Sequence, residues 1–335
     1  MSLAQHTATL HTGAKMPLLG LGTWKSKADE IRDAIVSALQ TGYRHLDCAA
    51  VYGNECHVGE ALKEALALTG IKRSEVFITS KLWDTMHDPD DVLPALKKSL
   101  ADLQLDYLDL YLIHNPYAFA KKDGQMMPKN PDGTIIYSDV HYCDTWKAME
   151  GLVDQSLCKA IGLSNFNHKQ VLDVIDKARI KPAVLQVECN PFFRQEKLID
   201  FCHSHGIVLT AYSPLCCGDR AWRYACDPDL FGDPKLMDIA KKHNKSVAQI
   251  ALRFQVQRGV VTIPKSVTPK WIEENAQIFD FSLSEDDIRQ ISSLKTHRMG
   301  IPPAKGPDNK PLLDDHGHPI PRDKDHQYYP FNEPF

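Results

Sequence analysis

The sequence lacks the features that define several broad classes of protein. No apolar run approaches the ~20 residues that a membrane-spanning helix needs. The N-terminus has neither the basic region nor the apolar region of a secretory signal. A net charge of −4 leaves no basic excess, which argues against a nucleic-acid or anionic-membrane partner. We therefore expect a cytoplasmic protein.

Metal-ligand spacing is also missing. The nine cysteines are an odd, dispersed set with no Cys-x-x-Cys pair, and His203-Ser-His205 stands without a neighbouring Cys pair or a His-Glu-x-x-His helix. In a reducing compartment such cysteines are mostly small buried hydrophobic residues. We expect no metal site.

Strand and helix patterns alternate along the 335 residues. We expect strands at 18–22, 184–188, 207–212 and 260–263, and others ending at 47, 81, 114 and 165. We expect helices at 29–39, 55–68, 89–103, 144–153, 168–177 and 195–205, two helical stretches before the strand at 260, and a helix from 269 onward. Eight such repeats predict a parallel sheet with helices outside. A doubly wound sheet would need a Gly-x-Gly-x-x-Gly turn, which Gly20-Leu-Gly22 does not supply. The pattern predicts an α/β fold, a (β/α)8 TIM barrel, with a hairpin at 9–15 capping its bottom.

Three segments interrupt the repeat: 115–143, 216–233 and the tail from 296. Loops of this length are typical of lids and binding loops, or of disorder. The first two leave from the C-terminal ends of strands, which favours lids. We expect one domain over 1–335, with 296–335 as a C-terminal loop.

Five polar residues fall at the ends of successive predicted strands. They are Asp47, Lys81, His114, Asn165 and Gln186. In a parallel barrel these ends converge on one face, and that face carries the active sites of barrel enzymes. The series predicts an active site there.

Asp47, Tyr52, Lys81 and His114 form a chemically meaningful group. A tyrosine phenol, with a reference pKa near ~10, donates a proton more readily at neutral pH when that pKa is lowered. A nearby ammonium favours the phenolate, and a carboxylate keeps that ammonium charged and in place. A neutral histidine can donate a hydrogen bond to a carbonyl oxygen. Taken singly, these residues could be a helix cap, packing, a solvated strand end and a core histidine; together they favour catalysis.

Longer motifs resemble the aldo-keto reductase family over nearly the whole chain. The matching stretches begin at Met16-Pro-Leu-Leu-Gly, Gly42-Tyr-Arg-His-Leu-Asp47, Ser80-Lys-Leu-Trp83, Asp106-Tyr-Leu-Asp, Lys159-Ala-Ile-Gly, Thr210-Ala-Tyr-Ser and Ile263-Pro-Lys-Ser. The resemblance implies a monomeric NAD(P)H-dependent carbonyl reductase acting on a small-molecule carbonyl substrate. Tyr52 would be its general acid, Asp47 and Lys81 would tune the phenol, and His114 would orient the carbonyl.

The resemblance also implies cofactor contacts. Ser164, Asn165 and Gln186 would hold the nicotinamide carboxamide, and Tyr212 would stack on the ring. Ser213, Leu215 and Asp219 would lie over the pyrophosphate, Lys265, Ser266, Val267 and Thr268 at the 2′-phosphate, and Glu274 and Asn275 near the adenine. Gly22, Thr23 and Trp24 would also contact the cofactor. A lysine, hydroxyls and N–H groups at a helix start suit a phosphate. Without the resemblance, a solvated junction and a core tyrosine are the ordinary interpretations.

Two positions depart from the family pattern. Trp271 stands where many NADPH-preferring members have an arginine, so we expect NADPH with NADH as a weaker alternative, and Lys270 could compensate. Asn115 follows His114 where aldose and aldehyde reductases often have tryptophan, which predicts a more open and polar pocket. Its apolar walls would be Trp24, Trp83 and Trp222.

The tail narrows the resemblance. Pro319-Ile-Pro-Arg-Asp323 and Tyr329-Pro-Phe-Asn resemble the C-terminus of aldehyde reductases, in which an arginine matched by Arg322 contacts acidic substrates. We expect reduction of aldehydes to alcohols. The alternatives are an aldose or xylose reductase, a non-catalytic channel-associated barrel, and a metal-dependent barrel hydrolase, which the lysine and tyrosine at the strand ends disfavour.

Overall fold

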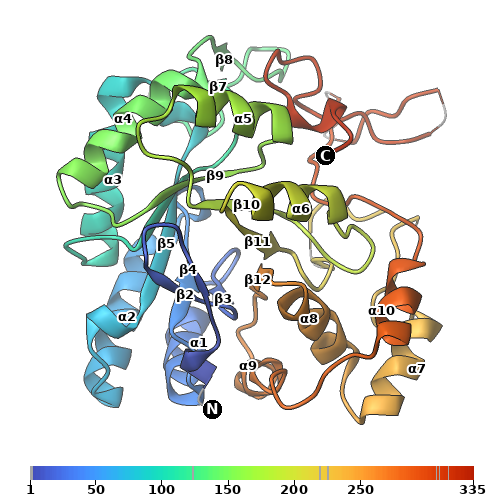
Figure 1. Ribbon diagram of the computed structural model, residues 1–335. Helices are drawn as coiled ribbons and strands as arrows, with labels where there is room; N and C mark the ends of the chain where they lie inside the picture. Colours follow the sequence, from blue (N-terminus) through green and yellow to red (C-terminus); the bar gives the residue numbers. More distant parts are fainter. Residues whose placement is uncertain are drawn as a thin grey trace.

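Eight short strands pair in parallel in the order in which they occur along the chain (Figure 1). The computed structural model describes residues 3–122, 124–218, 220–224, 226–306, 308, 310–315 and 317–335. The strands are β3 (Leu21–Gly22), β4 (His45–Asp47), β5 (Phe77–Leu82), β6 (Leu110–Ile113), β9 (Ile161–Ser164), β10 (Val184–Glu188), β11 (Val208–Tyr212) and β12 (Val261–Thr262).

The first and last strands meet and close the sheet. Leu19 bridges Thr262 and Gly22 bridges Lys265, and the Gly22 N–H donates to the Pro264 carbonyl at 3.0 Å. A Cβ atom on Gly22 would lie 2.9 Å from the Ile263 carbonyl oxygen, so a side chain here would push the two strands apart. The predicted closed (β/α)8 barrel is confirmed, with a first strand shorter than expected.

Helices surround the barrel (Figure 1). They are α1 (Ala28–Thr41), α2 (Glu55–Thr69), α3 (Pro89–Leu103), α4 (Tyr142–Asp154), α5 (His168–Lys177), α6 (Glu196–Ser204), α7 (Pro234–His243), α8 (Val247–Gln257), α9 (Pro269–Ala276) and α10 (Glu285–Ser292). The sequence predicted α3 and α5 with the same bounds but did not predict α10. Its start is marked by Ser284, whose hydroxyl accepts from the Asp287 N–H in a capping box.

Alternation along the strands separates two cores. On β6, Tyr111 and Ile113 pack toward the helices, whereas Leu110 and Leu112 lie inside the barrel. The hairpin of β1 (Thr7–Thr9) and β2 (Lys15–Pro17) supplies Met16 to this inner cluster and closes the N-terminal end of the barrel. The predicted hairpin is therefore present. The opposite end is left for polar side chains.

The segment 115–143 and the tail lie together at this polar end. The first contains a hairpin of β7 (Ala118–Phe119) and β8 (Tyr137–Ser138), which the sequence did not predict. The Tyr137 hydroxyl donates to Asp323 Oδ1 of the tail at 2.7 Å. In Figure 1 the tail, in red, lies beyond the strand ends on the side of this hairpin. No helix in the described ranges is long and apolar enough to cross a membrane.

Candidate active site

Strand alternation directs the predicted polar residues into the barrel. Asp47 is the last residue of β4 and Lys81 is the penultimate residue of β5, and both side chains are buried. Gln186 lies in the middle of β10 rather than at its end, yet its Nε2 donates to Asp47 Oδ2 at 2.8 Å. Three strands therefore bring these groups to one point.

Lys81 connects the carboxylate to the phenol. Its Nζ donates to Asp47 Oδ1 at 2.6 Å, to the Cys48 carbonyl at 2.9 Å and to the Tyr52 hydroxyl oxygen at 3.2 Å. Burial lowers the pKa of Lys81, but Asp47 and Tyr52 outweigh it, so the pKa is raised overall and the ammonium stays charged. Because Lys81 donates to the phenol oxygen, the Tyr52 O–H proton remains available for a substrate.

The pKa of Tyr52 is higher than the effect of Lys81 alone would make it. Burial raises this pKa, Lys81 lowers it and Asp47 raises it, and the balance is a pKa of about 12. The lysine acts in the expected direction, but loss of hydration outweighs it. The phenol is therefore a proton donor that remains protonated.

His114 follows β6 directly and faces the phenol. Its ring centroid lies 6.1 Å from that of Tyr52 and 5.3 Å from that of Trp83, with edge-to-face geometry in both cases. Burial first, and then the charge of Lys81, hold its pKa well below the usual value, so the imidazole is neutral. Its buried Nδ1 has no hydrogen-bond partner among the described residues.

The predicted carboxamide-binding residues also lie together. Asn165 adopts a left-handed conformation, with φ of 62°, directly after β9. Its Nδ2 lies 3.3 Å from the Ser164 hydroxyl, and its Oδ1 accepts from the Tyr212 hydroxyl at 2.9 Å. Asparagine tolerates this conformation better than most residues. Ser164, Asn165 and Tyr212 thus form one polar wall beside the phenol.

The predicted phosphate-binding residues lie at the β12–α9 connection. Lys265 is half-buried, and the Thr268 N–H donates to the Ser266 hydroxyl at 3.1 Å. Val267 and Thr268 lead into α9, where Glu274 is half-buried and Asn275 is buried. Trp271, in the first turn of α9, is 59% exposed. The side chain at this position therefore faces solvent.

The loops after β3 and β11 flank the site. The Thr23 N–H and hydroxyl both donate to the Asp47 carbonyl, at 3.1 and 2.8 Å. Trp24 and Trp222 have ring centroids 6.5 Å apart. Ser213 has φ of 49° and leads to the half-buried Leu215. Asp219, predicted to contact the pyrophosphate, lies outside the described residues.

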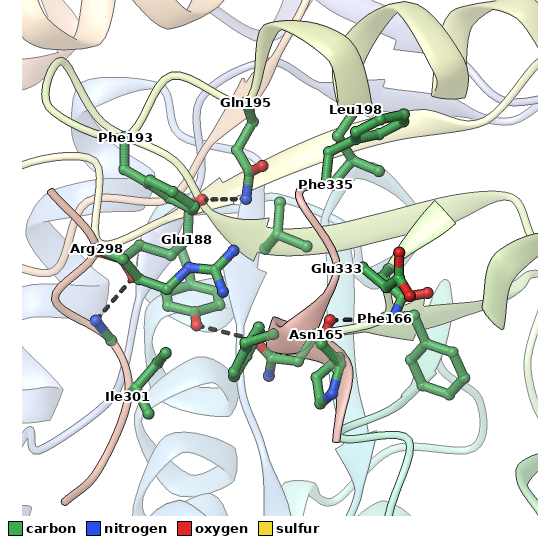
Figure 2. Close-up of a pocket in the computed structure, with 16 residues that line it drawn as sticks. Asn165, Phe166, Glu188, Phe193, Gln195, Leu198, Arg298, Ile301, Glu333 and Phe335 are labelled. Atoms are coloured by element: carbon green, nitrogen blue, oxygen red, sulfur yellow. Dashed lines mark hydrogen bonds between the residues drawn. The ribbon is translucent and has the colours of Figure 1, made fainter. Parts of the chain in front are cut away.

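A pocket beside this centre is lined by strand ends and by the tail (Figure 2). Asn165 and Glu188 contribute from the barrel. The Arg298 guanidinium lies 4.4 Å from the ring centroid of Phe193 and 4.3 Å from that of Phe331. Arg298, near the start of the tail, therefore contacts the β10–α6 loop through Phe193 and the end of the tail through Phe331.

One group of described residues has the ligand types of a metal site. His141, Cys143 and Asp173 place one ligand atom each within 4.8 Å of one another. However, Lys177 pairs with Asp173 at 2.7 Å, and His141 Nδ1 accepts from the Cys143 N–H, which leaves the proton on Nε2. These contacts oppose metal binding, and the expectation of no metal site stays a prediction.

Comparisons with known proteins agree with this architecture. The sequence profile described as "Aldo/keto reductase family" matches residues 18–296. The chain belongs to the aldo/keto reductase family.

Relatives within this family cover the whole chain. The chain is 56% identical to aldo-keto reductase family 1 member A1 of Xenopus tropicalis, covering 100% of both sequences. It is 50% identical to the human protein of the same name, covering 99% of this chain and 100% of the relative. The solved structure of the aldose reductase from Schistosoma japonicum superimposes with a TM-score of 0.86, at 40% identity, covering 98% of this chain and 99% of that one. As a member of this aldo-keto reductase family, the protein is an oxidoreductase.

Sequence reasoning missed two buried acids of this reductase. Asp84 follows the β5 strand end and is fully buried against Asn115. Glu188 ends β10 and accepts the N–H groups of Met299 and Gly300 at 2.9 and 2.7 Å. Both follow apolar runs, so the pattern that pointed to Asp47 could also have pointed to them.

Proposed function

We propose that this protein reduces aldehydes to primary alcohols with NADPH. The observation that carries the proposal is Lys81 Nζ, held between Asp47 Oδ1 at 2.6 Å and the Tyr52 hydroxyl at 3.2 Å, with a neutral His114 facing the same phenol. NADPH, when bound, supplies the hydride for the carbonyl carbon. Tyr52 protonates the carbonyl oxygen, and His114 donates the hydrogen bond that orients it.

Lys81 and Asp47 prepare the phenol for this step. The ammonium offsets charge that develops on the phenol oxygen as its proton leaves, and the carboxylate holds the ammonium in place. Gln186 fixes the second oxygen of that carboxylate. Both oxygens of the carboxylate therefore have partners, one on the adjacent strand β5 and one across the barrel on β10.

The chain has suitable groups along the length of such a cofactor. Ser164, Asn165, Gln186 and Tyr212 suit a carboxamide and its aromatic ring, and Gly22, Thr23 and Trp24 lie beside them. Ser213, Leu215 and Asp219 would lie over the pyrophosphate. The 2′-phosphate would be bound by Lys265, Ser266, Val267 and Thr268, and the adenine would lie near Glu274 and Asn275. Lys265 and the start of α9 offer positive charge and N–H groups for a phosphate. NADH is the weaker alternative because the exposed Trp271 supplies no charge.

The substrate would enter between aromatic side chains and the tail. Trp24, Trp83 and Trp222 provide apolar walls, and Trp83 Nε1 donates to the Met126 carbonyl at 2.6 Å. Arg322 lies 5.5 Å from the ring centroid of Phe119, in the loop that approaches this wall. It offers positive charge to a substrate carboxylate.

A sugar reductase is the second candidate. The similarity to the aldose reductase of Schistosoma japonicum favours it. Steady-state reduction of short aldehydes, aromatic aldehydes, aldoses and uronic acids, with NADPH and NADH compared, separates the candidates. Higher kcat/KM on aldoses than on simple aldehydes would favour the sugar reductase, and no turnover on any substrate would favour a non-catalytic barrel.

We also propose that the protein acts as a monomer in the cytoplasm. All nine cysteines are free thiols, which is common in a reducing compartment. Sedimentation of the purified protein would test whether it is a monomer. Imaging of a tagged copy would test whether it lies in the cytoplasm.

A further inference from the structure

Asn115 is held on both sides by polar partners. Its Nδ2 lies 3.1 and 2.9 Å from the two carboxylate oxygens of Asp84. Its Oδ1 accepts from Asn165 Nδ2 at 3.1 Å. With the side chain buried and both ends of the amide occupied, Asn115 connects two residues and has little capacity left for a substrate.

The connection continues to the proposed nicotinamide wall. Asn165 Nδ2 also donates to the His114 carbonyl at 3.0 Å, and the Tyr212 hydroxyl donates to Asn165 Oδ1 at 2.9 Å. Four side chains therefore form a relay, which runs from Tyr212 through Asn165 and Asn115 to Asp84. Figure 2 shows Asn165 within the pocket beside the tail.

The direction of the hydrogen bonds at Asn165 follows from the His114 carbonyl, which can only accept. The Asn115 NH₂ group faces both oxygens of Asp84, and its own oxygen faces the NH₂ group of Asn165. Asn165 then turns its NH₂ group toward Asn115 and the His114 carbonyl, and its oxygen toward Tyr212. The second lone pair of that oxygen remains open to a donor in the site.

Asp84 itself has few favourable contacts. It is 0% exposed, and no lysine, arginine or histidine in the described part of the chain forms an ion pair with it. Asn115 is its hydrogen-bond partner, whereas the nearby Arg322 is paired with Asp323. Burial raises the pKa of the Asp84 carboxyl well above its usual value, because the charged form loses its hydration there. The two oxygens of Asp84 hold the NH₂ group of Asn115 in its orientation.

We propose that Asp84 is a positioning residue that, through Asn115 and together with the His114 carbonyl, holds the amide of Asn165 in the orientation that accepts the carboxamide N–H of the cofactor. The proposal rests on the proposed function, which places the carboxamide against Asn165. Because Asp84 is fully buried, it would act through the relay and not by direct contact with a ligand. The rest of the cofactor site does not depend on it.

Binding of three ligands to purified Asp84→Leu and Asp84→Asn tests the proposal. The first ligand is NADP⁺. The second is its 3-acetylpyridine analogue, which lacks the N–H donors of the carboxamide, and the third is 2′,5′-ADP, which lacks the nicotinamide. Binding of each is followed by tryptophan fluorescence. Leucine removes the acceptor for Asn115, so we expect NADP⁺ to bind about tenfold more weakly, as for the loss of one hydrogen bond. Asparagine keeps one acceptor oxygen and should restore most of the affinity.

The other two ligands separate positioning from general damage. We expect 2′,5′-ADP to bind Asp84→Leu as tightly as it binds the wild type. The wild type should bind NADP⁺ more tightly than the analogue, and the ratio of these two affinities should be smaller in the variant. Glu55→Gln is the control, because Glu55 is a buried acid held by Ser80 and Ser99, outside the relay. It should leave the preference unchanged.

Asn115→Ala breaks the same relay at the residue between Asp84 and Asn165. This variant tests the proposal if Asp84→Leu does not fold. It should also narrow the preference for NADP⁺ over the analogue. The inference is overturned if variants that bind 2′,5′-ADP normally keep the wild-type preference, or if all three ligands weaken together. A wild-type protein that does not bind NADP⁺ would instead overturn the proposed function.

Discussion

Arg322 and Asp323, adjacent in the tail, form a bidentate ion pair. Arg322 Nε lies 2.8 Å from Asp323 Oδ1, and Nη2 lies 2.7 Å from Oδ2. Asp323 is buried, and the Tyr137 hydroxyl donates to the same Oδ1. Only Nη1 of the guanidinium, 3.8 Å from Met127 Sδ, has no oxygen partner among the described residues. A substrate carboxylate would therefore meet one N–H edge and not the complete fork.

Arg322→Ala should reduce kcat/KM about tenfold or more on an aldehyde with a remote carboxylate, and much less on a neutral aldehyde. A charge-assisted contact in a partly closed loop contributes about 1.5–3 kcal/mol, whereas a solvated pair contributes nearer ~0–1 kcal/mol. The measurement is parallel kinetics on the two substrates. Asp323→Asn, which releases part of the fork, should shift preference toward the acid. Equal losses on both substrates in Arg322→Ala would mean that the arginine only holds the loop.

Tyr52→Phe should lower turnover by roughly 10²–10⁴-fold or more, because the general acid is removed. The phenol oxygen accepts from Lys81, and its loss leaves the rest of the site in place. NADPH affinity, measured by fluorescence titration, should stay near wild type. Tyr142→Phe is the matched control, since that phenol lies on α4 and donates to Asp173. Near-normal turnover in Tyr52→Phe would exclude the mechanism.

Lys81→Met should impair alcohol oxidation more than aldehyde reduction. Reduction uses the protonated phenol, whereas oxidation needs the phenolate as a base. Lys81 lowers the pKa of Tyr52, which is about 12 with the lysine present, so removing it raises that pKa and makes the phenolate rarer. Rates in both directions across the alkaline range test this. Lys159→Met, at a half-exposed lysine paired with Asp109, serves as control. Parallel losses in both directions would contradict the role of Lys81 in setting the pKa.

Trp271→Arg should tighten NADPH relative to NADH by about 1 kcal/mol or more, through a charge-assisted contact with the 2′-phosphate. The exposed position in the first turn of α9 leaves room for the longer side chain. The ratio of the two dissociation constants is the measurement. Lys270→Ala should move that ratio the other way if Lys270 compensates for the missing arginine. An unchanged ratio in Trp271→Arg would place residue 271 away from the phosphate.

Much of the fold followed from local patterns. Helices α3 and α5 and strand β10 have the predicted bounds because their start signals and apolar periods are short-range properties. Polar residues after apolar strands pointed to Asp47, Lys81 and His114, since a parallel barrel collects strand ends on one face. The resemblance carried the family assignment, which the comparisons confirmed.

Other properties depended on contacts between distant segments. The sequence shows that Lys81 can lower the pKa of Tyr52, but only the packed barrel decides that burial outweighs it. Nothing local shows that Arg322 is paired with its neighbour, or that Asp84 reaches Tyr212 through Asn115 and Asn165. Hydration and hydrogen-bond partners depend on every element that packs around a group. Sequence alone therefore determined which groups are present at this end of the barrel, and tertiary structure decided their protonation and orientation.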